Sequence, residues 1–112
     1  MKVRGKVWFE RDGEHVFGKG RADLLRAVQR TGSISAAAEA LGMSYRHAWS
    51  MLNSSAERYG RALVVTERGG AEGGGARVTE FGRRLLRLHA RLQSEMEDWL
   101  EDSQNAMDDA GR

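Results

Sequence analysis

The chain contains no cysteine and no long run of apolar residues. The absence of cysteine excludes a disulfide framework, a thiol nucleophile and a thiolate metal site, and it suits a reducing cytoplasm. Three of the first six residues are charged, and these six residues lead into no apolar segment, so we expect neither a signal peptide nor a transmembrane helix. These absences predict a soluble, cytoplasmic protein that has no membrane partner.

Patterns typical of enzymes are also missing. The three histidines are scattered, and no paired carboxylates or His-Glu-x-x-His motif stand out. The glycine-rich segment 69–75 does not end in Gly-Lys-Ser/Thr and does not join a strand to a helix, so it does not match a nucleotide-binding loop. We therefore expect no enzymatic activity, no metal and no cofactor.

The charge is distributed unevenly along the 112 residues, a length that fits one domain. Residues 94–112 contain seven acidic residues and one basic residue. The first 93 residues contain 17 basic and 9 acidic residues, a balance of +8. A basic body with an acidic end favours a polyanion-binding body, although a basic solvated surface without a partner is the alternative.

The first half of the chain predicts a hairpin followed by three helices. Residues 3–17 alternate loosely around Asp12-Gly13, which is a strong signal for a two-residue turn. A short amphipathic helix is expected over about 21–30. A second helix is expected over 34–41, capped by Ser33 or Ser35 and ended at Gly42, where positive φ costs little.

The second half predicts two strands and a long helix. LVVTER at 63–68 and ARVT at 76–79 read as strands, and five glycines lie among the seven residues between them. Thr79 can cap a final helix that begins at Glu80. The fold class is therefore mainly α (α+β), a winged helix–turn–helix with an N-terminal β-hairpin and a long C-terminal dimerisation helix. The expected divisions are the hairpin at 1–18, the winged helix–turn–helix at 19–79 (helix–turn–helix 34–60, wing 63–79), the dimerisation helix at 80–102 and an acidic flexible tail at 103–112.

The helix expected from Tyr45 to about Tyr59, with Ser44 as its cap, has two faces. One arc contains mainly apolar residues, and we expect Tyr45 and Trp49 on it to pack mainly in the core. The opposite arc is polar and suits the major groove of DNA. Arg46 can contact guanine or phosphate, and Asn53 can pair with adenine. The other predicted contacts on this helix are Ser44, Tyr45, His47 and Ser50. The alternative is a solvated surface helix.

The final helix has an apolar stripe that continues for about 20 residues. So small a domain cannot cover the whole stripe, and its last members would lie exposed in a monomer. Pairing of two chains would cover it, although packing on the chain's own domain is the alternative. The residues assigned to dimerisation are Leu85, Leu88, Leu92, Met96 and Trp99.

Two stretches resemble a known family. GSISAAAEALGMSYRHAWSMLN at 32–53 and RALVVTERGGAEGGGARVTEFGRRLL at 61–86 are similar to the N-terminal DNA-binding domain of ModE-type, molybdate-responsive transcriptional regulators. They are more distantly similar to the LysR-type winged helix. The resemblance implies a homodimeric repressor or activator whose reading helix and wing hold DNA. It assigns 44–47 to the reading helix, and Arg68 and Arg77 to the flanks of the wing.

The resemblance does not extend to a molybdate sensor. Members of this family sense molybdate in a separate C-terminal region of β-barrel modules, and no strand-rich segment follows the long helix here. The sequence therefore predicts a homodimeric, sequence-specific regulator that binds double-stranded DNA and lacks the sensing domain. A separate effector-sensing protein is a further expected partner. The alternative function is a protein-interaction module that acts through the C-terminal helix and the acidic tail.

Overall fold

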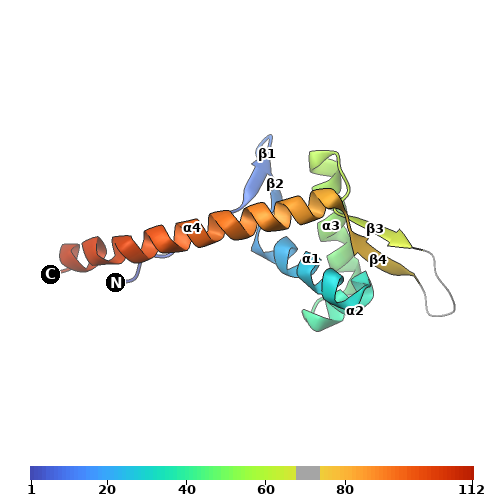
Figure 1. Ribbon diagram of the computed structural model, residues 1–112, viewed down its shortest axis with the longest axis horizontal. Coiled ribbons are helices and arrows are strands. Elements are labelled where there is room, and N and C mark those ends of the chain that lie inside the picture. The colour runs from blue at the N-terminus through green and yellow to red at the C-terminus, as the bar shows by residue number, and fades with distance from the viewer. Residues whose placement is uncertain (68–73) are drawn as a thin grey trace.

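The computed structural model describes residues 1–67 and 74–112. It is an elongated molecule, about 64 Å in its longest dimension, in which one long helix projects from a small body (Figure 1). Within the described residues, the body contains three helices and two separate two-stranded antiparallel sheets. This arrangement confirms the predicted fold class. The elements are β1 (Phe9–Arg11), β2 (Glu14–Phe17), α1 (Lys19–Thr31), α2 (Ile34–Ala40), α3 (Tyr45–Tyr59), β3 (Val64–Glu67), β4 (Gly75–Val78) and α4 (Glu80–Ala110).

The N-terminal hairpin is shorter than expected. Its turn residues Asp12 and Gly13 have φ values of 52° and 79°, as a tight turn between two strands requires. The strands pair only from Phe9 onward, so residues 1–8 lie outside the hairpin. The alternation in the sequence begins at Val3, but residues 3–8 do not pair with a strand and lie along α4.

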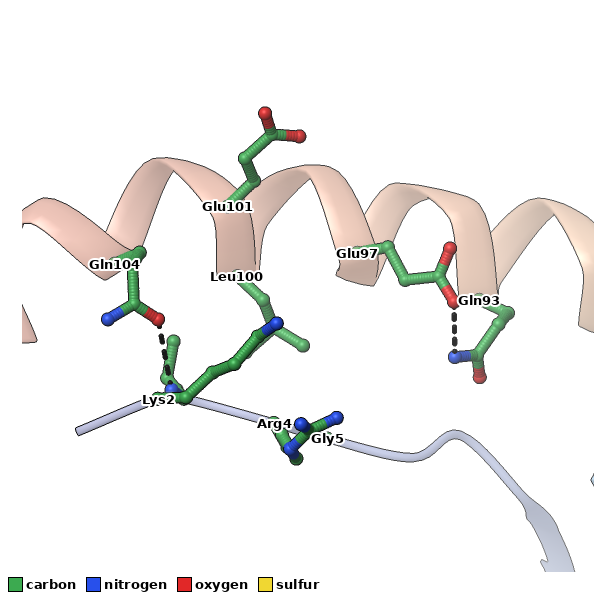
Figure 2. A pocket seen from close by; sticks show the side chains of 9 residues that line it. Lys2, Arg4, Gly5, Gln93, Glu97, Leu100, Glu101 and Gln104 are labelled. Atoms are coloured by element: carbon green, nitrogen blue, oxygen red, sulfur yellow. Dashed lines mark hydrogen bonds between the residues drawn. The ribbon is translucent and has the colours of Figure 1, made fainter.

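Residues 1–8 form an N-terminal strap that runs along α4 toward its C-terminal end (Figure 1). The Val3 N–H donates to Gln104 Oε1 at 3.1 Å, and Gln104 Nε2 donates to the carbonyl oxygen of Met1 at 2.9 Å. Nearer the body, the Val7 N–H donates to Gln93 Oε1 at 3.4 Å. Figure 2 shows the hollow between the strap and this face of α4. The strap is thus attached by glutamine side chains in place of a neighbouring strand.

α4 continues to Ala110, so the expectation that the helix ends near 102 and is followed by a flexible tail is corrected. Gln104 lies within the extra turns, and it also donates to Asp108 Oδ1 one turn later at 2.9 Å. Contacts between side chains four residues apart stabilise a helix, and the strap supplies a further anchor. The acidic end of the chain is therefore helical as far as Ala110.

Small side chains let α2 pack closely against α1 and α3. Ala37 and Ala38 are fully buried, and Ser33 Oγ accepts the Ala36 N–H at the start of the helix. Gly42 has a φ of 69° in the turn that follows. The predicted cap and turn are confirmed, with Ser33 and not Ser35 as the cap.

α3 buries a narrower arc than its sequence pattern indicates. Ala48, Leu52 and Ser55 are buried and span about 60° at 100° per residue. Tyr45 and Trp49 lie beyond one edge of this arc and are 53% and 48% exposed. The expectation that these two side chains pack in the core is therefore wrong, because α2 and β2 cover only one side of the helix.

The wing is anchored to the rest of the body at its base. β3 and β4 pair from Val64↔Val78 to Glu67↔Gly75, and the Ala76 N–H donates to Gly32 O at 2.8 Å. The second of these contacts joins the wing to the turn between α1 and α2. It therefore holds the wing in a set position beside the helix–turn–helix.

Burial and two nearby arginines, Arg21 and Arg58, affect the pKa of His15 on β2 of the hairpin. Burial lowers the pKa of His15, Arg21 and Arg58 lower it further, and Glu10 opposes them. The folded state therefore favours neutral His15, and below its ordinary pKa of about 6.5 the unfolded chain binds the proton more readily. We expect this contribution to stability to be complete above about pH 6.5 and to decline as the pH falls toward the lowered value.

Thermal melting of the His15→Asn variant tests this expectation. Its melting temperature should decline less steeply between about pH 7 and pH 5 than that of the unaltered chain. The two proteins differ only at residue 15, so the difference between the two slopes reports His15 alone. Equal slopes would contradict the expectation.

Candidate nucleic-acid interface

The first two turns of α3 present free polar side chains. Arg46, His47 and Ser50 are exposed, and in the part of the chain that the structure describes none of these side chains has a hydrogen-bond or ion-pair partner. Ser44 Oγ accepts the His47 N–H at 3.0 Å, which confirms Ser44 as the cap. The positive end of the helix dipole lies at this end, which suits a phosphate.

The polar residues farther along α3 are already engaged. Asn53 is half-buried, and its Nδ2 donates to Glu57 Oε1 at 3.2 Å. Ser54 Oγ accepts from Arg21 Nη2 at 3.0 Å, so this hydroxyl is committed to the contact between α1 and α3. Asn53 has to exchange its intrahelical partner before it can pair with a base. The groups that are free to bind lie between residues 44 and 50.

Arg21 is a structural cation of this region that the sequence interpretation did not single out. Its Nε donates to Met51 O at 3.1 Å. Burial lowers the pKa of Arg21, and the nearby charge of Arg58 lowers it further. Because the guanidinium of Arg21 already donates hydrogen bonds to α3, we assign Arg21 to positioning this helix.

The wing contributes one described cation. Arg77 on β4 is exposed and forms an ion pair with Glu67 on the paired strand β3. This pair reduces the positive charge that the wing base offers to a phosphate. Arg68, the other expected flank, and most of the glycine-rich tip lie outside the described residues.

Two hollows flank Trp49 between α3 and the base of the wing. Sequence reasoning placed this side chain in the core, and only its position beyond the buried arc shows it as part of the surface. No periodicity in the sequence could have separated these possibilities, because the residue lies at the edge of the apolar arc. Both hollows are lined by Trp49 on α3 and by Thr66 on β3.

The residues that the sequence assigns to dimerisation differ in exposure. Leu88 is 39% exposed and Trp99 is 65% exposed, whereas Leu85 and Leu92 are half-buried. Met96 faces the strap, since its Sδ would lie 3.0 Å from a Cβ placed on Gly5. The expectation that Leu92 and Met96 lie exposed in a monomer is therefore wrong, while Leu88 and Trp99 remain uncovered.

Among residues 1–67 and 74–112, no group of three or more histidine and carboxylate side chains is placed to hold a metal ion. Within those ranges, no helix has the length and apolar character needed to cross a membrane.

A helix–turn–helix followed by a two-stranded wing defines the winged helix–turn–helix class. The family model of bacterial regulatory helix-turn-helix proteins of the lysR family matches residues 21–83, and the chain belongs to this family. Its similarity to ModE proteins makes it a ModE-type member that corresponds to their N-terminal helix–turn–helix domain.

The relatives are longer proteins. Transcriptional regulator ModE of Yersinia pestis is 38% identical over 91 residues, covering 79% of this chain and 35% of that protein. The DNA-binding transcriptional dual regulator ModE of Escherichia coli K12 is 38% identical over 85 residues, covering 73% and 32%. The crystal structure of ArgP from Mycobacterium tuberculosis superposes with a TM-score of 0.54 at 28% identity, covering 77% and 30%. This chain spans about a third of the length of these proteins.

Proposed function

We propose that this chain is a sequence-specific DNA-binding transcriptional regulator. The main supporting observation is the start of α3, where Arg46, His47 and Ser50 are exposed and unpaired among the described residues. An arginine and a hydroxyl on an exposed helix are groups that read base edges in the major groove. The α1–α2–α3 body and the wing base hold this helix at a set angle.

We propose further that the regulator acts as a homodimer through α4. Leu88 and Trp99 lie at equivalent rotational positions on this helix, and their exposure leaves an uncovered apolar stripe. A twofold dimer would present two α3 helices about 34 Å apart, or a multiple of that distance, to successive major grooves. Its operator would then be palindromic.

Effector sensing, where it occurs, is proposed to reside outside these 112 residues. The matched relatives include the molybdenum transport protein ModE of Azotobacter vinelandii, but the similarity covers only 30% of its length. Sensing would then depend on residues beyond this segment or on a separate protein. Added molybdate is accordingly expected to leave the DNA affinity of this chain unchanged.

Fluorescence anisotropy with a labelled random-sequence duplex tests the proposal. The affinity should fall steeply with salt, since each neutralised phosphate contributes roughly −0.9 to the slope of log K against log salt. The titration is repeated with molybdate. An absence of binding even at low salt would overturn DNA binding and favour the protein-interaction module, and a molybdate effect would overturn sensing elsewhere.

Replacing Arg46 with alanine identifies the reading helix. On an operator isolated by selection from random sequences, the loss should be about 1–3 kcal/mol if Arg46 contacts a guanine. Arg4→Ala is the matched control, because it removes the same charge from the strap, far from α3 (Figure 1). Equal affinities of the two variants would remove Arg46 from the interface.

A further inference from the structure

Trp49 separates two hollows at the junction of α3 and the wing. The first, of about 190 Å³, lies between α3 and β3 and includes Leu52, Val64 and Thr66 in its lining. The second, of about 330 Å³, reaches from the start of α2 to the wing base at Gly75, and Tyr45 also lines it. Ile34, Thr66 and Trp49 line both hollows, and the half-exposed indole of Trp49 is the largest of these side chains, so we call it the ridge.

The exposure of this ridge is unusual for a large aromatic side chain. Trp49 and Tyr45 are about half exposed, and both line the larger hollow. A contiguous apolar surface of this kind marks a binding site more often than an isolated exposed leucine does. The uncovered stripe on α4 lies on another element, so dimerisation through that stripe does not require the ridge.

The chemistry around the ridge suits the backbone of DNA. Ser33, Ser35 and Thr66 line the hollows. Glu67 is the one carboxylate among the described lining residues, and its charge is paired with Arg77. An indole offers an apolar face and one N–H donor, which match the apolar face of a deoxyribose and the oxygen of the adjoining phosphate.

Geometry favours the same ligand. In B-DNA, a single sugar–phosphate strand separates each major groove from the neighbouring minor groove. If α3 occupies a major groove and the wing the adjacent minor groove, that strand has to cross the surface between α3 and β3. Trp49 lies on this surface, continuous with Arg46 and Ser50 on the outer side of α3.

We propose that Trp49 packs on a deoxyribose of the intervening strand and donates its indole N–H to the adjoining phosphate. This inference rests on the proposed DNA-binding function and adds a residue that sets the angle of α3 on the duplex. Trp49→Ala should weaken binding to a random duplex about tenfold, as expected for losing a hydrogen bond to a charged group. Trp49→Phe, which keeps a ring without the donor, should lose less.

A spectroscopic readout separates contact from a general structural role. The full chain is labelled with 5-fluorotryptophan, and its three ¹⁹F resonances are assigned with single Trp→Phe variants. On addition of the random duplex, the Trp49 resonance should shift while that of Trp8, on the N-terminal strap, stays unchanged. Circular dichroism melts of both Trp49 variants check that they fold.

The outcomes distinguish the two proposals. Binding with an unmoved Trp49 resonance, or with unchanged affinity in folded Trp49→Ala, overturns the inference and leaves DNA binding in place. If the unaltered chain binds no duplex at any salt concentration, the proposed function itself fails. A Trp49 shift together with an affinity ranking of unaltered chain, then Phe, then Ala supports the contact.

Discussion

Replacing both Leu88 and Trp99 with glutamate is expected to produce a folded monomer that binds its operator at least about 100-fold more weakly. Both side chains are exposed on α4, so their loss should hardly affect the fold of a single chain. In the dimer they would meet a second apolar stripe, where a buried unpaired carboxylate is strongly unfavourable. Dissociation then removes the gain from binding two half-sites through one molecule.

Sedimentation and operator titration measure the two parts of this result. The matched control is Ser94→Glu with Asn105→Glu, which adds two acidic groups to exposed positions of α4 away from the apolar stripe. It should remain dimeric. If the variant with glutamate at positions 88 and 99 still sediments as a dimer, the interface lies elsewhere. If the unaltered chain sediments as a monomer, the dimer proposal fails.

Gly82→Ala is expected to lower the stability of the domain by at least about 1–3 kcal/mol, the usual cost of overpacking. A Cβ on Gly82 would lie 2.6 Å from Leu63 O and 2.7 Å from Val78 Cγ1. Leu63 O cannot easily withdraw, because it accepts the Thr79 N–H at 2.9 Å in the junction between the wing and α4. Alanine is the better helix former by about 1 kcal/mol, but the contact with backbone outweighs that preference.

Thermal melting of this variant should show a loss of about 4 °C or more for each kcal/mol. Gly20→Ala is the control, because its nearest contact would be Met51 Cε at 3.4 Å, an ordinary van der Waals distance in the first turn of α1. That variant should melt at or above the temperature of the unaltered chain, because the new methyl group meets no clash and alanine favours the helix. A Gly82→Ala protein that melts as high as Gly20→Ala would contradict the close approach of α4 to β3.

The features that depend on a few neighbouring residues can be predicted from the sequence. Asp12-Gly13 makes a tight turn because both residues tolerate positive φ, and Gly42 turns the chain for the same reason. Ser44 and Thr79 begin helices because their hydroxyl oxygens accept an N–H three residues later. These local interactions set the order of the elements, and with it the winged helix–turn–helix class.

Packing between distant segments determines which side chains of those elements are exposed to solvent. Trp49 lies on the apolar arc of α3 when the helix is considered alone. The neighbouring elements cover only a narrow part of that arc, so the indole lies between α3 and the wing. The N-terminal strap reaches Gln104 across 101 residues, and this contact accompanies the continuation of α4 to Ala110. The periodicity of a sequence reports the two faces of a single helix. Which side chains of that helix are buried depends on the segments, distant in sequence, that pack against it.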